Sequence, residues 1–507
     1  MTELLLTGRD LSPEDLDAVA RAGRPVRPAP EALAAMARSR AVVESHLAAG
    51  RAVYGLTTGL GSRVTHSLPR EVHGDFSRLT VRGRSHAVGP PMARGLVRAV
   101  MTVRLNGLLS AGAGADPALA EMLAALLNQG LHPVLPGIGS IGAGDLCVLA
   151  QLGRAVIGEG EIEVAGTRLP AEEALAKAGL NPLSLGPKDG LAICNASSYG
   201  TGLAALALVE AEALAESAQI AAALSMEGFR ANPSPLDARA VGARPAPGQG
   251  AAAERLRALL AGGALLEPGA ARRVQDPISL RCASQVHGAL LTALDVTRAA
   301  IMPELNGAAD NPLVLTDDDD ILSTGNFHTP ALALALEMLS QAVAQTGALA
   351  VSRTGALLLP RLSDLPLNLS PHGADRSGFA PLMKVAMALQ QEIRHGAQPA
   401  PHDLRWSADG VEDDLTNGPL AAKKLREQLE KLRLVLSIEL IVAAQAVDMA
   451  EIVTLGHGTA AVHRVVRGLV ELLDDDRPLS GDIERLAEDG LASGRLNETV
   501  EAALQAG

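Results

Sequence analysis

The chain has 507 residues, of which 48% are hydrophobic, 20% are charged and only 1% are aromatic. A core with so few aromatic side chains must be filled by Ala, Leu, Val and Ile, and this favours packed helices. The formal net charge of -13 and the lack of a Lys/Arg-rich block argue against a nucleic-acid partner, because phosphates are repelled by an acidic surface. A small-molecule partner fits better.

The first predicted helix covers 145–158, "DLCVLAQLGRAVIG", and follows a tight glycine turn. We expect the carboxylate of Asp145 to cap this helix, since Asp is a favoured N-cap residue. Alternation and glycines in "GEGEIEVAGTRLP" then predict a hairpin over 158–170. Strands elsewhere look few and short.

Long apolar runs with few helix breakers dominate the rest of the chain. They predict buried helices that form a bundle, over 201–226, 330–357, 379–396 and 418–453. Pro/Gly-rich and acidic stretches predict an irregular connection at 231–250 and an exposed turn at 316–326.

Cysteine, histidine and N-terminal patterns exclude further classes. Three cysteines, far apart and odd in number, predict neither a disulfide framework nor a Cys-x-x-Cys metal site. None of the 12 histidines has the spacing of a metal site, so we predict no metal. Residues 1–20 lack the basic start and long apolar core of a signal peptide. We expect a cytoplasmic protein without a membrane partner.

The stretch "GIGSIG" at 137–142 fits the pattern G-x-G-x-x-G, which can open a dinucleotide-binding unit. That unit needs a strand before the glycines and alternating strands and helices after them. Here "LHPVLP" precedes the glycines with two prolines, and helices dominate downstream. A tight turn before a helix is the simpler interpretation.

Short motifs lie in order between about residue 50 and residue 416. They are "AVYGLTTGLGS" (52–62), "RSHAVG" (84–89), "GSIGAGDL" (139–146), "GLAICNAS" (190–197), "VQDPISLRC" (274–282), "DNPLV" (310–314), "GNFH" (325–328) and "VEDDLT" (411–416). Together they resemble the motifs of the aromatic amino acid ammonia-lyase family, which includes histidine and phenylalanine ammonia-lyases. "RSHAVG" is closer to the histidine branch.

The resemblance implies a role for each matching position. It places Tyr54 as the catalytic base, Asn195 beside the family's cofactor, and Arg281 as a clamp for the substrate carboxylate. It also assigns catalytic positions to Ala143, Gly144, Gln275 and Glu412, and substrate-binding positions to His86, Ile278, Asn311 and Phe327. Taken alone, the amides could be turn or capping residues, and Arg281 could form a structural ion pair.

The resemblance also implies a mainly α protein with the ammonia-lyase (fumarase/aspartase-like) fold. We expect an N-terminal domain over 1–200, small and mixed, with the glycine loop and the tyrosine base. A long-helix bundle over 201–507 would complete the site. The family forms homotetramers whose sites are completed by several subunits, and an amino acid or a derivative is the implied small-molecule partner.

The sequence departs from the family where the chemistry is done. The family motif Ala-Ser-Gly cyclises into a methylidene-imidazolone (MIO), an electrophile, but Ala143 is followed directly by Gly144. MIO is therefore expected for the family and not formable from these two residues. Gly139-Ser140-Ile141 does contain a serine, but its third residue is β-branched. Ile278 replaces a family tyrosine, Val411 a glutamine and Asp414 a histidine.

Three functions remain open at this point. The first is an ammonia-lyase acting on a histidine-like or other small L-amino acid, with an unusual electrophile or none. The second is a diverged enzyme that uses Tyr54 as base in an elimination, addition or isomerisation needing no MIO. The third is a pseudoenzyme, a helical oligomer kept for binding or assembly.

Overall fold

The computed structural model describes residues 2–400, 410–450 and 454–506. Contacts between Cα atoms divide the chain into two compact units, each assembled from three segments. Unit 1 comprises Met1–Val209, Arg298–Leu336 and Ala400–Lys423, and unit 2 comprises Glu210–Thr297, Glu337–Pro399 and Lys424–Gly507. The expected domains, 1–200 and 201–507, stay a prediction.

All strands found in the described residues belong to unit 1, and all are short. They are β1 (Leu4–Leu6), β2 (Val26–Pro28), β3 (Val88–Pro91), β4 (Leu131–Pro133), β5 (Pro136–Ile138), β6 (Glu161–Val164), β7 (Thr167–Pro170), β8 (Leu313–Leu315) and β9 (Asp320–Leu322). They form the small sheets β1-β2, β3-β5, β4-β6-β7 and β8-β9. The antiparallel β6-β7 pair confirms the hairpin predicted over 158–170.

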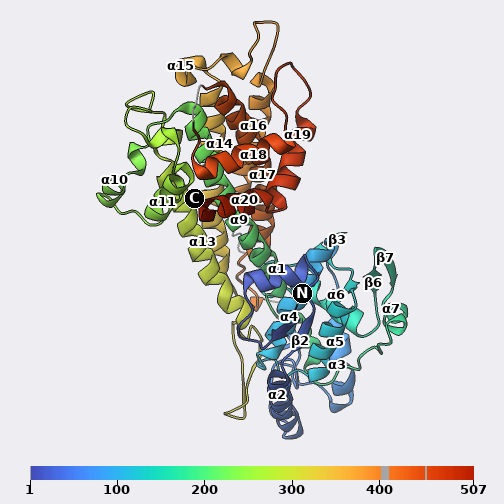
Figure 1. Ribbon diagram of the computed structural model, residues 1–507. Coiled ribbons are helices and arrows are strands. Elements are labelled where there is room, and N and C mark those ends of the chain that lie inside the picture. The colour runs from blue at the N-terminus through green and yellow to red at the C-terminus, as the bar shows by residue number, and fades with distance from the viewer. Residues whose placement is uncertain (1, 401–409, 451–453, 507) are drawn as a thin grey trace. The chain divides into compact units, whose positions relative to one another are not determined.

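The shorter helices of unit 1 lie in the blue to teal part of Figure 1, with strands β1 to β7. They are α1 (Pro13–Ala20), α2 (Pro30–Ala48), α3 (His73–Arg82), α4 (Arg94–Leu109), α5 (Pro117–Asn128), α6 (Leu146–Val156), α7 (Ala171–Lys177) and α8 (Asp189–Cys194). Local sequence sets their starts. Ser12 accepts a hydrogen bond from the Asp15 N–H at the start of α1, and Pro13 occupies the first turn, where it sacrifices no helical hydrogen bond.

Four long helices contribute residues to both units: α9 (Ser198–Phe229), α13 (Ala283–Asn306), α14 (Pro330–Leu357) and α17 (Gly418–Met449). The helices predicted over 201–226 and 330–357 are thereby confirmed. The helix predicted over 418–453 is confirmed as far as Met449, and its last residues, 451–453, lie outside the described residues.

The remaining helices belong to unit 2, which has no strand in its described part. They are α10 (Ala238–Gly242), α11 (Gln249–Leu260), α12 (Ile278–Arg281), α15 (Pro360–Ser363), α16 (Ala380–Gly396), α18 (His457–Leu469), α19 (Ser480–Arg485) and α20 (Arg495–Ala506). Helix α16 confirms the helix predicted over 379–396, but not its expected burial, because Leu382, Ala386 and Ile393 are the only buried ones among its described residues. The protein is therefore mainly α, as expected.

Two local expectations were only partly right, and the structure excludes the dinucleotide unit that the sequence already disfavoured. The stretch 231–250 is not wholly irregular, because Asp237 accepts a hydrogen bond from the Arg239 N–H and starts α10. The turn expected over 316–326 includes strand β9, which pairs with β8. The dinucleotide unit is excluded, since β5 pairs antiparallel with β3 and the parallel arrangement that unit requires is missing.

Two helical stretches, Asp189–Phe229 and Pro330–Leu357, are long and apolar enough to cross a membrane by length and composition alone. In the first, 94% of the most apolar window is buried inside the protein, and in the second 56% is. An internal helix passes the same test, so length and composition are weak support for a membrane span.

Candidate active site

A cavity of about 330 Å³ in unit 1 gathers much of the chemistry expected from the sequence. Six predicted site residues lie on its wall, together with glycines and apolar side chains: Tyr54, Ala143, Asn195, Asn311, Phe327 and Glu412. They come from segments more than 350 residues apart, so tertiary folding builds this wall. Gly144 lines a smaller adjoining cavity that shares Phe327.

The glycine turn beside the cavity requires residues without a β-carbon at two positions. Gly142 and Gly144 both have φ of 81°, in the left-handed region that favours glycine. A Cβ on Gly142 would lie 2.1 Å from Oγ1 of Thr416. Thr416 donates through Oγ1 to the Gly142 carbonyl at 3.0 Å, and the Asn417 N–H donates to the Ile141 carbonyl at 3.0 Å. The segment that carries Glu412 is thereby attached to the turn.

Asp145 ends the turn, and its carboxylate does not cap α6 as the sequence predicted. It is 1% exposed, and Oδ2 accepts hydrogen bonds from the N–H groups of Tyr199 at 2.8 Å and Gly200 at 3.0 Å. Those groups belong to the first turn of α9, so Asp145 caps a different helix. Burial raises the pKa of Asp145 to about 6, although hydrogen bonds from Ser140, Gly200 and Tyr199 act in the opposite direction.

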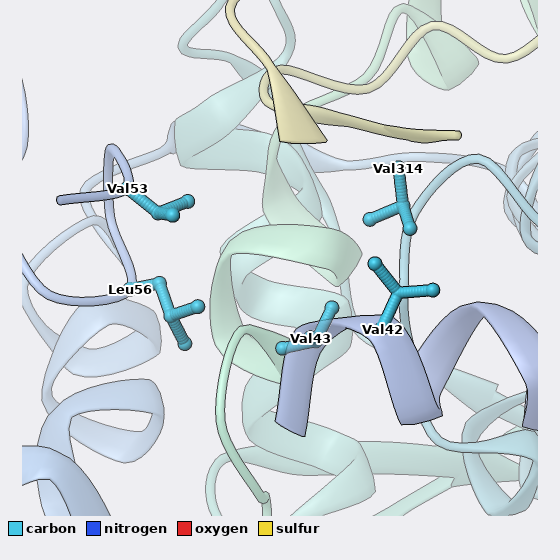
Figure 2. Packing of buried hydrophobic residues seen from close by; sticks show 5 residues of the cluster. All are labelled: Val42, Val43, Val53, Leu56 and Val314. Carbon is cyan, nitrogen blue, oxygen red and sulfur yellow. The ribbon is translucent and has the colours of Figure 1, made fainter. Parts of the chain in front are cut away.

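Tyr54 is held by a turn and by a small apolar cluster. Its hydroxyl accepts a hydrogen bond from the Gly61 N–H at 3.1 Å, and its side chain is half-buried. Figure 2 shows the flanking residues, Val53 and Leu56, with valines of α2 and β8. Because Val53 and Leu56 are buried in this cluster, they hold the backbone on both sides of Tyr54 in place. The Tyr54 side chain itself lies on the cavity wall.

Asn195 and Asn311 are connected directly. Asn195 lies at the C-terminal end of α8, and its Nδ2 donates to the Asn311 carbonyl at 2.8 Å. Oδ1 of Asn311 accepts a hydrogen bond from the Thr324 N–H at 2.9 Å. A Cβ on Gly144 would lie 3.1 Å from Oδ1 of Asn195, so the turn approaches this amide closely.

A buried ion pair holds in place the two segments that carry Asn195 and Asn311. Arg104 on α4 donates through Nη2 to Oδ1 of Asp310 at 2.8 Å, and the two side chains are 1% and 2% exposed. The same nitrogen donates to the Ala192 carbonyl of α8. Arg104 therefore holds the residue before Asn311 and the helix that ends at Asn195. Arg104 lies in none of the motifs that carry the family resemblance.

The cavity wall contains two charged side chains, Arg84 and Glu412. Arg84 belongs to the motif "RSHAVG", from which the analysis selected His86. His86 is exposed and is not part of the wall. Arg84 could have been recognised as a site residue from its position just after α3, because a long cationic side chain there can extend beyond the end of the helix.

The remaining predicted site residues, Gln275, Ile278 and Arg281, belong to unit 2. Gln275 is exposed, and Ile278, at the start of α12, is 62% exposed. Nε of Arg281 is buried and has no hydrogen-bond partner within the described part of the chain. Their assignment to a site remains a prediction. The same holds for the absence of a metal, although the described residues contain no group of three potential ligands.

The glycine turn does not fit the MIO ring of the resembled family. Gly144 has no β-carbon that could become the methylidene group, and the Asp145 N–H, which would close a ring on Ala143, donates to the Ala196 carbonyl at 2.8 Å. The hydroxyl of Ser140 donates to Asp145 and accepts a hydrogen bond from the Gly142 N–H at 3.2 Å. In Ala143-Gly144-Asp145 and in Gly139-Ser140-Ile141, the groups that ring formation would use are thus engaged in other hydrogen bonds.

Comparisons with known proteins extend over almost the whole chain. A family model described as aromatic amino acid lyase matches residues 11–468. A histidine ammonia-lyase from Gloeobacter violaceus is 39% identical over 503 residues, which cover 99% of this chain and 98% of the relative.

Two solved structures are also similar. Ergothionase from Treponema denticola, an ergothioneine degrading enzyme in complex with desmethyl-ergothioneine sulfonic acid, has a TM-score of 0.92 and 32% identity, covering 98% of this chain and 99% of that one. Histidine ammonia-lyase from Trypanosoma cruzi has a TM-score of 0.91 and 30% identity, covering 99% and 96%.

The fold and these matches define the class first: the protein is an enzyme, a carbon–nitrogen lyase with the mainly α ammonia-lyase fold. Within that class, the chain belongs to the aromatic amino acid lyase family, and it is similar to histidine ammonia-lyases along its length.

Proposed function

We propose that this protein eliminates an amine from a histidine-like α-amino acid without the MIO electrophile of its family. The observation that carries the proposal is the turn itself, in which Ala143 is followed by Gly144 and no side-chain hydroxyl is available for dehydration. The similarity to histidine ammonia-lyases supports the side-chain class. The cavity wall, with Tyr54 and Glu412, supports binding of a small polar ligand.

The missing electrophile restricts the leaving group. In an ordinary α-amino acid the ammonium N–H is far more acidic than the β C–H, so a base takes the wrong proton. A quaternary ammonium has no N–H. The base then removes the β-proton, the C–H electron pair forms the C=C bond, and the C–N bond breaks with its electron pair on nitrogen. The products are an acrylate and a neutral tertiary amine. We therefore propose a trimethylammonium betaine of a histidine-like acid as the preferred substrate.

The solved ergothionase supports this leaving group by analogy, because its name states that it degrades ergothioneine. Ergothioneine is the trimethylammonium betaine of a 2-thiohistidine. The ammonia-eliminating alternative, with L-histidine as substrate, rests on the histidine ammonia-lyase relatives. The two reactions share the base and the acrylate product and differ only in the nitrogen substituents.

Tyr54 is the proposed base, since its hydroxyl is on the cavity wall and it is one of only two tyrosines in the chain. Asn195, Asn311 and Phe327 would position the substrate. Gln275, Ile278, Arg281 and His86 are proposed as further contacts on the family resemblance alone. The same resemblance supports a homotetramer. The acidic composition argues against a nucleic-acid partner, and three cysteines, far apart and odd in number, support a reducing, cytoplasmic compartment. No membrane partner is proposed.

Two measurements test the proposal together. Ring closure plus dehydration removes two waters, about 36 Da, so the intact mass should equal the encoded mass. The purified protein is then incubated with L-histidine, L-phenylalanine, L-tyrosine, the trimethylammonium betaine of histidine and ergothioneine, and acrylate formation is followed by ultraviolet absorbance. We expect turnover of a betaine and none of the free amino acids.

Two other outcomes would contradict the proposal. A mass about 36 Da low, together with turnover of L-histidine, would establish the ammonia-lyase alternative and overturn the ring-free reaction. An unmodified mass with no turnover of any of the five compounds would favour the pseudoenzyme.

A further inference from the structure

Arg84 is an uncompensated cation in the cavity. Its side chain is half-buried, and within residues 2–400, 410–450 and 454–506 its guanidinium makes one long hydrogen bond, from Nη1 to the Thr80 carbonyl at 3.5 Å. That length exceeds the usual range for N–H to O bonds, so nearly all of its donors remain unused. No carboxylate pairs with Arg84 among the residues that the structure describes. A guanidinium keeps its charge at any ordinary pH, and this cavity must therefore accommodate it.

Its neighbour Arg82 has the opposite situation. Arg82 closes α3, lies outside the cavity wall, and donates through Nε to both carboxylate oxygens of Glu159, at 2.9 and 3.1 Å. The end of α3 thus already has a paired cation to interact with the helix dipole. The dipole of α3 therefore does not explain why Arg84 lies on the cavity wall. An anionic group on a bound ligand would explain it.

Glu412 provides the second charge of the wall. It is half-buried, and no ion pair joins it to Arg84, although the two line the same cavity of about 330 Å³. A cation and an anion that do not neutralise each other in one small cavity are complementary to a ligand with charges of both signs. Hydrogen bonds between charged groups are stronger than those between neutral groups, so both ends of such a ligand would be recognised.

We propose that Arg84 binds the carboxylate of the substrate through a paired hydrogen bond, while Glu412 binds the imidazole-like end of the same molecule. The inference rests on the proposed function and deepens it, because it assigns the carboxylate contact to a residue of the cavity wall itself. The planar guanidinium fork matches a carboxylate, and the Glu412 carboxylate accepts the ring N–H. A ligand held at both ends presents its β-carbon between them, on the wall that carries Tyr54.

The test uses two non-reacting ligands that differ only in charge: 3-(imidazol-4-yl)propanoate and its primary amide. Binding to the full-length protein is measured by calorimetry for wild type, Arg84→Gln and Arg82→Gln. Arg84→Gln should weaken propanoate binding about tenfold to a hundredfold, the range expected for one charge-assisted contact, and leave amide binding unchanged. Arg82→Gln removes the same formal charge outside the cavity and should change neither.

A third variant, Arg281→Gln, distinguishes the competing assignment. If Arg281→Gln loses propanoate selectively and Arg84→Gln does not, Arg281 is the clamp and the inference is overturned. Equal weakening of propanoate and amide by Arg84→Gln would also overturn it, since that pattern indicates a disturbed fold. Thermal melts of each variant report on folding independently.

Failure of the inference and failure of the proposed function give different results. If wild type binds propanoate and turns over a betaine while Arg84→Gln behaves like wild type, only the carboxylate assignment fails. If wild type binds neither ligand and has no turnover, the proposed function fails and the assignment fails with it.

Discussion

Asp145 and Tyr199 are joined by a hydrogen bond of 2.8 Å, from the Tyr199 backbone N–H to Oδ2 of Asp145. The Gly200 N–H reaches the same oxygen, so one buried carboxylate satisfies two N–H groups of the first turn of α9. The residue that ends the glycine turn thus also caps α9, a helix that begins at Ser198, far along the chain. Because α9 is 32 residues long, this contact sets the turn against a rigid element.

The raised pKa of Asp145 predicts a pH-dependent effect of Asp145→Asn on stability. The native pKa of about 6 exceeds the ordinary aspartate pKa of 3.8, so the ionised carboxylate costs stability above pH 6, and that cost disappears as the pH falls towards 3.8. Asparagine keeps an acceptor for α9 without the charge. The free energy of unfolding of the variant relative to wild type should therefore be higher at pH 8 than at pH 4.5, by roughly 2 kcal/mol.

Urea unfolding at both pH values measures this difference. Asp318→Asn, at an exposed turn position, serves as a matched control and should give the same difference at both. A difference for Asp145→Asn that did not vary with pH would show that the carboxylate is not the titrating group.

Tyr54→Phe should abolish turnover while leaving the fold intact. Loss of a general base reduces the rate by about two to four powers of ten, whereas the lost Gly61 hydrogen bond costs only about 1 kcal/mol of stability. Tyr199→Phe is the natural comparison, because that hydroxyl donates to the Gly137 carbonyl at 2.7 Å and is not on the cavity wall. Steady-state kinetics with the accepted substrate would remove Tyr54 from the mechanism if its variant kept the wild-type rate.

Arg104→Met should destabilise the protein strongly, because it leaves Asp310 buried without its partner. Breaking a buried pair by removing one side typically costs about 3–5 kcal/mol. The double variant Arg104→Met/Asp310→Leu removes both charges and should recover much of that loss. A double-mutant cycle by denaturant unfolding measures the coupling, and strict additivity of the two single changes would refute it.

His287 predicts a loss of stability in acid that arises in unit 2. It is 1% exposed, and neither ring nitrogen has a hydrogen-bond partner in the described part of the chain. Burial, with a smaller repulsion from Arg353, lowers the pKa of His287 to about 3. The unfolded state therefore binds a proton near pH 6.5 that the native state does not, and the free energy of unfolding falls as the pH drops from 6.5 towards 3.

Removal of His287 should make the free energy of unfolding depend less on pH. We expect His287→Leu to reduce the slope by up to about 1.4 kcal/mol per pH unit over that range, measured by urea unfolding at pH 4 to 7. The control is His395→Gln, at an exposed position of α16. An unchanged slope in His287→Leu would mean that this imidazole takes up a proton in the native state.

The sequence was sufficient where a pattern is local. A continuous apolar run predicted α9 because a buried helix must be apolar nearly all round, and alternation predicted the β6-β7 hairpin. The start of α10 was missed, because Pro and Gly nearby outweighed the capping signal of Asp237 in a short window. The family and the missing serine were also readable directly, since motif order and residue identity need no coordinates.

Only the tertiary structure decided which groups meet. Asp145 precedes α6 in the chain but caps α9, because folding brings N–H groups 54 and 55 residues away within 3.0 Å of its carboxylate. Arg84 and Glu412 are 328 positions apart and share one cavity, and Arg104 holds two distant asparagine segments. Local propensity fixes the elements, whereas the pairing of buried charges depends on three-dimensional packing that residue spacing does not encode.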